Sequence, residues 1–195
     1  MASTIEKIKQ LREETAAGMM DVKRALEESG GDLDGARRIL KERGQAIAAK
    51  KSARETNEGL IDAYIHFNGR VGVLVEVNCE TDFVARTEEF RQLVRDIAMH
   101  IASMKPLVVR PEDIPEEVRA QERAIFEKQA AEMNKPEQVT RSIVEGKLKK
   151  WEAEQALMTQ PFVKDPERTV GELVQEAIGR IGENITVRRF TRYEL

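Results

Sequence analysis

Residues 59–79 decide the fold, and they read GLIDAYIHFNGRVGVLVEVNC. Apolar residues alternate with other residues on both sides of the pair Asn68-Gly69. The alternating residues are Ile61, Ala63, Ile65 and Phe67 before the pair, and Val71, Val73, Val75 and Val77 after it. Two alternating runs around Asn-Gly predict a β-hairpin with a tight type I′ turn, in which both central residues take positive φ.

Toward the C-terminus, an amphipathic helix is expected directly after the hairpin. Thr87 is its expected N-cap and Pro106 marks its end. Its buried face consists of apolar residues at helical spacing: Phe90, Leu93, Val94, Ile97 and Ile101. A last helix is expected from a cap at Thr169 to Gly182, and the tail 183–195 is expected to form a strand. That strand joins either the sheet of the hairpin or the sheet of a partner.

Between these helices, residues 107–168 contain five prolines and two highly charged stretches with helical character, roughly 116–134 and 137–155. Their apolar residues are sparse. This pattern is typical of helices that pack on one side only, or of a projecting helical hairpin.

Toward the N-terminus, the first 44 residues predict three short helices. Ser3 or Thr4 caps the first, Asp21 the second and Asp32 the third, and Gly44 is the expected end of the third. Three helices in so short a stretch form a small bundle with a thin core, which predicts a module joined to something larger.

These patterns predict an α+β chain made of several parts. Residues 1–44 form the three-helix module and 45–58 a helical or flexible linker, with continuation of the third helix past Gly44 as the alternative. Residues 59–195 form an α+β core with a small antiparallel sheet and flanking helices. This core carries a charged helical insertion at about 112–156 and the C-terminal helix and strand at 169–195.

The composition excludes several classes of protein. Hydrophobic residues make up 41% of the 195 residues, which is too high for a disordered chain. The net charge of −3 argues against a dedicated nucleic-acid binder. A single cysteine, Cys79, excludes an intramolecular disulfide and a cysteine-rich zinc module. The sequence has no secretory signal and no run of about 18 apolar residues, so we expect a cytoplasmic protein without membrane contact.

Motifs for covalent chemistry are absent from the sequence. It has no phosphate-binding G-x-x-x-x-G-K-[ST] loop, no G-x-G-x-x-G after a strand, no G-x-S-x-G and no H-E-x-x-H. We therefore expect no catalytic residues, no metal and no cofactor.

The segment 78–85, NCETDFVA, joins the hairpin to the following helix and is open to two interpretations. Asp82 and Phe83 can form an exposed tip that pushes into a partner. Alternatively, Thr81 or Asp82 caps a helical turn and Phe83 packs beneath it, which composition alone favours because aromatic residues are usually buried. Cys79 is expected to be a small buried residue.

Four stretches, in order along the chain, resemble the family of bacterial translation elongation factor Ts. They are 11–26 (LREETAAGMMDVKRAL), 77–86 (VNCETDFVAR), 160–165 (QPFVKD) and 181–190 (IGENITVRRF). Together they span nearly the whole chain, which makes the resemblance highly specific.

The resemblance implies a guanine-nucleotide exchange factor that binds elongation factor Tu and has no covalent chemistry of its own. It implies that the N-terminal module is similar to ubiquitin-associated domains and docks on the nucleotide-binding domain of the partner. It also implies that the pair Asp82-Phe83 inserts near the magnesium and phosphate-loop region, and that the C-terminal part of the core holds the third domain of the partner. The contact residues carried over are Arg12, Met19, Met20, Asp21, Val22, Thr81, Asp82, Phe83 and Val84.

Long members of the family carry a second core subdomain, whereas the core here looks single. Short forms are expected to compensate by pairing as homodimers. Two other functions compete with nucleotide exchange: a ubiquitin-associated-like adaptor without exchange activity, and an enzyme that uses Asp82 in a pocket with another carboxylate. Exposure of Phe83 distinguishes these possibilities.

Overall fold

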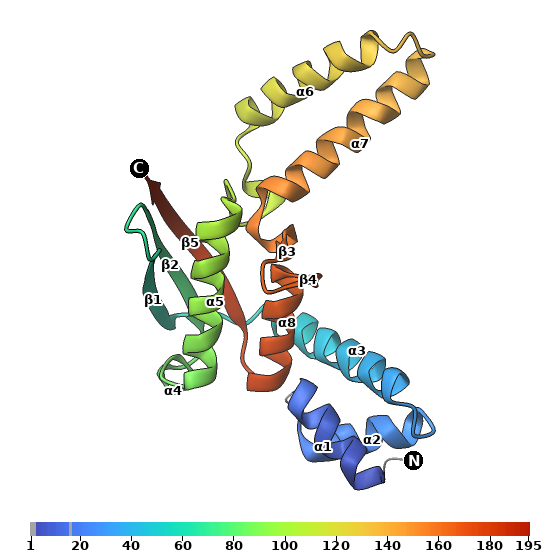
Figure 1. The fold of residues 1–195 in the computed structure, drawn as a ribbon, viewed down its shortest axis with the longest axis vertical. Coiled ribbons are helices and arrows are strands. Elements are labelled where there is room, and N and C mark those ends of the chain that lie inside the picture. The colour runs from blue at the N-terminus through green and yellow to red at the C-terminus, as the bar shows by residue number, and fades with distance from the viewer. Residues whose placement is uncertain (1–2, 16) are drawn as a thin grey trace. The chain divides into compact units, whose positions relative to one another are not determined.

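The computed structural model describes residues 3–15 and 17–195, so Ala16, within the first of the four motifs, lies outside the described residues. The chain mixes helices with small sheets, which confirms the α+β class at this level (Figure 1). It divides into two compact units. The first comprises residues up to Leu60, Val77–Leu93 and Leu173–Thr186, and the second comprises Ile61–Glu76, Val94–Glu172 and Val187–Leu195.

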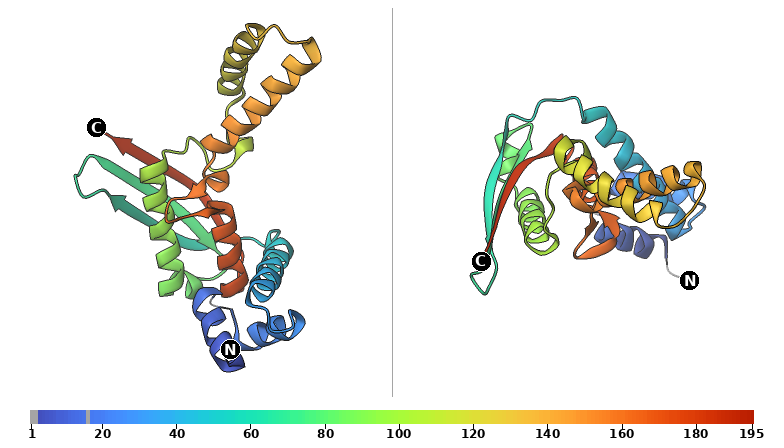
Figure 2. Two further views of the ribbon diagram at one scale, coloured as in Figure 1. Left: turned by 45° about the vertical axis from the view of Figure 1, so that its right-hand side comes forward. Right: turned by 90° about the horizontal axis from the view of Figure 1, so that it is seen from above.

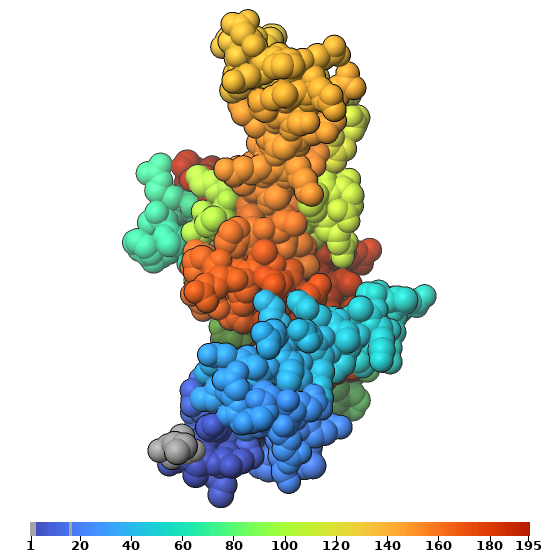
Figure 3. Space-filling view, turned by 90° about the vertical axis from the view of Figure 1, so that its right-hand side faces the viewer, coloured from blue at the N-terminus to red at the C-terminus, as the bar shows by residue number. Residues whose placement is uncertain are grey.

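Three helices open the first unit: α1 (Thr4–Thr15), α2 (Met19–Glu28) and α3 (Leu33–Lys51). They pack into one body, drawn in blue to cyan in Figure 3. Their shared core consists of six buried side chains: Leu11, Val22, Ala25, Leu26, Ala36 and Leu40.

Two of the three predicted caps are present. Ser3 Oγ accepts from the N–H of Glu6 at 3.2 Å, and Asp32 accepts from the N–H of Gly35 at 2.7 Å. The prediction that Asp21 caps α2 is wrong, because the helix begins at Met19 with Gly18 at the N-cap. The N–H of Asp21 already donates to the carbonyl of Gly18, so Asp21 lies inside the first turn.

The predicted helix end at Gly44 is also wrong, and the alternative of a continuous helix is confirmed, since α3 runs on to Lys51. The Ala-rich residues 45–51 favour helix. Gly44 lies where helix α8 (Val170–Ile181) comes close: a Cβ placed on Gly179 would lie 3.0 Å from the Cα of Gly44. The close approach of the two helices needs a glycine at Gly179, whereas a Cβ on Gly44 would meet open space, so Gly44 sits inside α3 without ending it.

A three-stranded sheet is formed by β1 (Glu58–Ile65), β2 (Val71–Cys79) and β5 (Ile185–Glu194), in the order β1-β2-β5. This confirms the hairpin and places the last strand in the sheet of its own chain. In the second unit, the N–H of Leu195 donates to the carbonyl of Arg70 at 3.0 Å, which sets β5 antiparallel to β2.

The predicted type I′ turn of the hairpin is wrong. The N–H of Gly69 donates to the carbonyl of His66 at 2.8 Å, and Gly69 has a φ of 67°. Among the described residues other than glycine, only Lys105 and Asn134 have positive φ, so Asn68 does not. The strands are joined by five residues, His66–Arg70. This longer loop places its single left-handed position at the glycine, after an ordinary turn.

Within the second unit, the later part of α5 (Glu88–Met104) lies along one face of the sheet (Figure 2). Val73 and Val75 are buried on that side. The apolar residues Ile61, Ile65 and Leu74 are exposed. A Cβ placed on Gly72 would lie 3.1 Å from Ile65 Cδ1, so these side chains share the opposite face.

The two charged stretches form helices α6 (Glu116–Ala131) and α7 (Glu137–Gln155), which pack side by side (Figures 1 and 2). Arg119 on α6 donates to Glu152 on α7 at 2.7 Å. Trp151, the one tryptophan of the sequence, is half-buried on α7. The predicted helical hairpin is confirmed, although α6 ends three residues earlier than expected.

Short elements complete the second unit. Strands β3 (Pro161–Phe162) and β4 (Asp165–Thr169) form a two-stranded antiparallel sheet that the sequence did not predict. Short 3₁₀ turns lie at Pro111–Asp113 and Leu157–Thr159.

His100 on α5 is fully buried. Its Nδ1 accepts from the N–H of Val163 at 3.1 Å, so Nε2 carries the proton and donates to Gln160 Oε1 at 3.0 Å. Burial lowers the pKa of His100, and this histidine is a structural part of the core.

Candidate functional site

The segment that follows β2 forms one short helical turn, α4 (Asp82–Ala85). Thr81 has an extended backbone, and its side chain accepts from the N–H of Val84 at 3.4 Å, as an N-cap does. Thr87 then caps α5, with the N–H of Phe90 donating to its Oγ1 at 3.2 Å. Two caps six residues apart hold the backbone of this turn.

Thr81 is tied to a distant part of the first unit. Its N–H and its Oγ1 donate to the two carboxylate oxygens of Glu183, at 3.0 Å and 2.7 Å. Glu183 lies in the loop between α8 and β5. Bonds to a charged acceptor are the strong ones, so Glu183 holds the start of α4 in place.

A second link joins the same two segments, but here the carboxylate belongs to the segment before α4. Glu80 accepts from the N–H of Asn184 at 2.6 Å and from Arg54 at 3.3 Å. These partners, with the N–H of Asn184 as the larger cause, lower the pKa of Glu80. Asn184 itself is buried and donates to the carbonyl of Arg54 at 2.7 Å. The sequence motifs 77–86 and 181–190 therefore meet in space.

Phe83 projects from this anchored turn, with 80% of its surface exposed. The interpretation of Phe83 as a buried residue is wrong, although its companion, the Thr81 cap, is correct. Asp82 is half-exposed and pairs with Arg86 at 2.7 Å, and Val84 is half-buried. The turn thus presents an aromatic ring with a carboxylate beside it.

Cys79, at the end of β2, is a small buried residue, as predicted. Burial, with Glu183 as a lesser cause, raises the pKa of its thiol to about 11. Its Sγ donates to the carbonyl of Thr81 at 3.1 Å. The thiol therefore supports the turn and is not a nucleophile.

The candidate contact residues of the N-terminal module fall into two groups. Met19 and Met20 expose 56% and 62% of their surface. Arg12 is also exposed, and Asp21 is half-buried and pairs with Arg24 at 2.7 Å. Val22 is fully buried in the three-helix core, so the structure does not expose this predicted contact residue.

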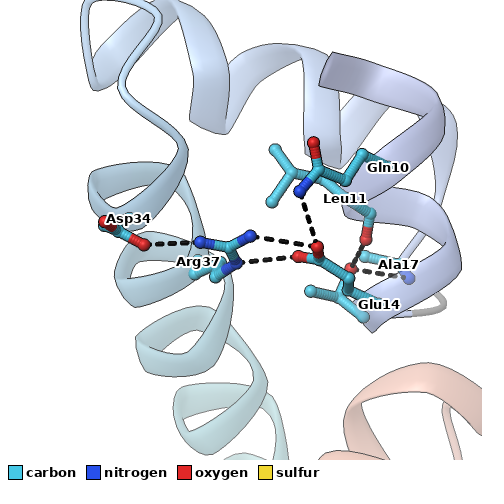
Figure 4. A network of polar contacts seen from close by, with 7 residues as sticks. Gln10, Leu11, Glu14, Ala17, Asp34 and Arg37 are labelled. Carbon is cyan, nitrogen blue, oxygen red and sulfur yellow. Dashed lines mark hydrogen bonds and ion pairs between the residues drawn. The ribbon is translucent and has the colours of Figure 1, made fainter. Parts of the chain in front are cut away.

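A polar network braces this module between α1 and α3 (Figure 4). Arg37 donates to both oxygens of Glu14, at 2.7 Å and 3.0 Å, and also pairs with Asp34. The hydrogen bonds from Arg37 lower the pKa of Glu14. Such a two-point contact fixes the orientation of one helix against the other.

Two residues that hold the turn, Glu183 and Asn184, are not among the site residues predicted from the sequence. Both lie in the fourth motif, which is the signal that could have found them. Their role depends on a contact across about one hundred residues of sequence, which no local pattern reveals.

Neither Asp82 nor Phe83 lines the cavity that the structure shows in the second unit. This cavity has a volume of about 520 Å³. Among residues 3–15 and 17–195, no three His, Cys, Asp or Glu side chains gather as metal ligands do. Within the same described residues, every helix is too short or too polar to cross a bilayer.

Comparisons with known proteins agree with the motifs. A family model described as "Elongation factor TS" matches residues 3–195. An elongation factor Ts of Rubrobacter xylanophilus is 79% identical over 195 residues, covering all of both chains. An elongation factor Ts of Carboxydothermus hydrogenoformans is 55% identical over 192 residues, covering 98% of this chain and 88% of the relative. Because the family model and these relatives match nearly the full length of the chain, the chain belongs to the elongation factor Ts family.

Proposed function

We propose that this protein is a guanine-nucleotide exchange factor that binds elongation factor Tu and promotes the release of GDP. The observation that carries the proposal is the 80% exposure of Phe83 on a turn held by Thr81 and Glu183. A free aromatic ring on a rigid support is suited to insertion into a partner, because little conformational entropy is lost on docking.

Exchange requires no covalent step. The factor binds nucleotide-free partner more tightly than GDP-bound partner, and linkage then requires that it weakens GDP by the same factor. Full burial of a phenyl side chain contributes about 1.5–3 kcal/mol. Because most of Phe83 is exposed before docking, insertion supplies up to about 2 kcal/mol, or roughly 30-fold in affinity. Asp82 adds a negative charge next to the ring, near the magnesium and phosphates of the partner.

The three-helix module is proposed to be ubiquitin-associated-like and to dock on the nucleotide-binding domain. Met19 and Met20 are exposed apolar side chains of an adaptable kind, and Arg12 is an exposed cation of the same module. The C-terminal part of the core is proposed to hold the third domain of the partner. Docking through these surfaces, without cofactor, nucleic acid or membrane, is proposed to support translation elongation in the cytoplasm.

The experiment that tests the proposal measures release of a fluorescent GDP analogue from purified elongation factor Tu. The wild-type protein is expected to accelerate release in proportion to its concentration, and the double variant Asp82→Ala, Phe83→Ala is expected to lose most of this acceleration. Phe67→Ala is the matched control, because Phe67 is an even more exposed ring outside the site. Acceleration that survives the double variant would refute the role of the turn. No acceleration by folded wild-type protein would refute exchange and favour the adaptor function.

We also propose that the protein pairs as a homodimer through the exposed face of its sheet. Ile61, Ile65 and Leu74 form an apolar surface there, and Tyr193 of β5 is exposed as well. Exposed apolar side chains gathered on one sheet face are typical of an interface between proteins. Leu74→Asp is expected to convert a dimer into a monomer in light scattering, whereas Leu107→Asp, a change at a similarly exposed leucine outside the sheet, leaves the mass unchanged. A monomeric wild-type protein would refute this proposal.

A further inference from the structure

The second unit contains a cavity of about 520 Å³, which is within the size range of sites for small ligands. It lies between the β1–β2 hairpin, the last turns of α5, the β3–β4 hairpin and the end of β5. Its walls include apolar and aromatic side chains: Tyr64, Val71, Met99, Ala102 and Val163. None of these residues belongs to the turn around Phe83.

Two rings on one wall are held in place. Tyr64 Oη and His66 Nδ1 are 3.1 Å apart and hydrogen-bonded, and the His66 ring lies 4.4 Å from that of Phe67. A wall of fixed rings offers a flat apolar group a surface for stacking without first ordering the side chains.

Positive charge predominates around the cavity. Three cations from separate parts of the chain line it, Lys105, Lys164 and Arg192, against one carboxylate, Glu194. Lys164 is partly neutralised by Asp96, at 2.7 Å. Even with Asp96 counted, the cations outnumber the carboxylates by three to two.

Two of these cations already hold a carboxylate. Lys105 donates to both oxygens of Glu194, at 2.9 Å and 2.7 Å, and Arg192 donates to the same group at 2.8 Å. Arg192 is itself fixed, since it donates to the carbonyl of Ala102 at 3.2 Å and 3.1 Å. Arg192 first, and Lys105 second, lower the pKa of Glu194 to about 2.

Lys105 occupies an unusual position. It follows α5 with a φ of 52°, in the left-handed region where glycine is the common residue. Residues other than glycine that are held in this disfavoured backbone conformation cluster at functional sites. The carboxylate that it binds belongs to Glu194, a partly exposed residue near the end of β5.

From this geometry we propose that the cavity binds a small organic anion, with a flat apolar part against Tyr64 and His66 and a carboxylate or phosphate on Lys105 and Lys164. Glu194 is the internal competitor that occupies the anion position when the ligand is absent. The proposal does not depend on the exchange function.

The test is a titration of ¹⁵N-labelled full-length protein, followed by amide chemical shifts. Phenyl phosphate and benzoate are the probes, benzyl alcohol is the neutral counterpart, and inorganic phosphate is the bare anion. Both aromatic anions are expected to give saturable shifts around Ser103 and Lys164. Equal binding of benzyl alcohol would overturn the anion site, and equal binding of inorganic phosphate would overturn the apolar part.

Variants of the lining residues test the site through changes in the affinity for phenyl phosphate. Glu194→Gln removes the internal competitor and is expected to tighten phenyl phosphate at least threefold. Lys105→Gln with Lys164→Gln is expected to weaken it at least tenfold, while Lys150→Gln, which removes a lysine charge on α7, leaves it unchanged. Absence of saturable shifts in both the wild-type protein and Glu194→Gln would overturn the proposal.

Discussion

Replacing Thr81 by valine tests how the turn that carries Phe83 is supported. Valine has nearly the same shape, so the substitution removes the hydroxyl without leaving a cavity. Two interactions are lost: the 2.7 Å bond to Glu183 and the 3.4 Å cap on the N–H of Val84. A hydrogen bond to a charged group contributes about 1.5–3 kcal/mol. A long cap of this kind adds about 0.5 kcal/mol. Because Glu183 keeps its bond from the Thr81 N–H, we expect a net loss of about 2 kcal/mol, or roughly 30-fold in the folding equilibrium.

The assay is urea denaturation followed by circular dichroism, paired with GDP release from elongation factor Tu. Thr81→Ser keeps the hydroxyl and is expected to recover most of the loss. Thr140→Val removes an exposed hydroxyl on α7 and is expected to change little. Because fewer Thr81→Val molecules carry an ordered turn, this variant is expected to accelerate GDP release less, in proportion to that fraction. The reasoning is refuted if Thr81→Val is as stable as wild type, or if Thr81→Ser is as unstable as Thr81→Val.

Three further perturbations have defined outcomes. Gly44→Ala is expected to raise the free energy of unfolding by about 0.5–1 kcal/mol, because its Cβ meets open space inside a helix. Gly179→Ala is expected to lower the free energy of unfolding, because its Cβ would press on Gly44. Urea denaturation of both variants tests these two expectations. His100 has a lowered pKa in the folded state, so its contribution is complete above its unfolded pKa of about 6.5 and declines as the pH falls toward the folded value. The urea midpoint of wild type should therefore drop more between pH 7.5 and pH 5 than that of His100→Gln, and equal drops would contradict this assignment. Glu14→Gln removes an ion pair with Arg37 that is more than one third exposed. We expect the free energy of unfolding to fall by only about 0.5 kcal/mol at pH 7, and not to change below the folded pKa of Glu14. Thermal melts at the two pH values measure this difference.

Local signals predicted the elements well where the physics is local. The hairpin, the amphipathic α5 and the caps at Ser3, Asp32, Thr87 and Thr169 follow from alternation, helical spacing and side-chain hydrogen bonds that span three residues. The cap at Asp21 was misplaced because Gly18 can start a helix without a side chain.

Tertiary contacts explain what the sequence did not predict. Gly44 looked like a helix end because glycine is common there, but it does not take the positive φ of such an end, and α3 continues through it. The short strand Pro161–Phe162 is below the length at which alternation can be recognised.

The candidate site was predicted in part. Resemblance to the family selected Asp82 and Phe83, whereas composition alone favoured a buried Phe83. The anchor of the turn at Glu183 depends on a contact over 102 positions, and the burial of Val22 follows from the packing of three helices. Neither the contact of Glu183 nor the burial of Val22 can be predicted from the motif in which that residue lies.

The single tryptophan on α7 has a consequence for spectroscopy. Trp151 belongs to the second unit, so intrinsic indole emission reports on α7 and its surroundings, whereas far-ultraviolet ellipticity sums the helices of both units. A chain that unfolds in one step gives coincident curves by the two methods. The variant Thr81→Val, which lies in the first unit, provides a direct reading of cooperativity. If it displaces the ellipticity curve and leaves the emission curve in place, the two units melt separately; if both curves move together, they melt as one.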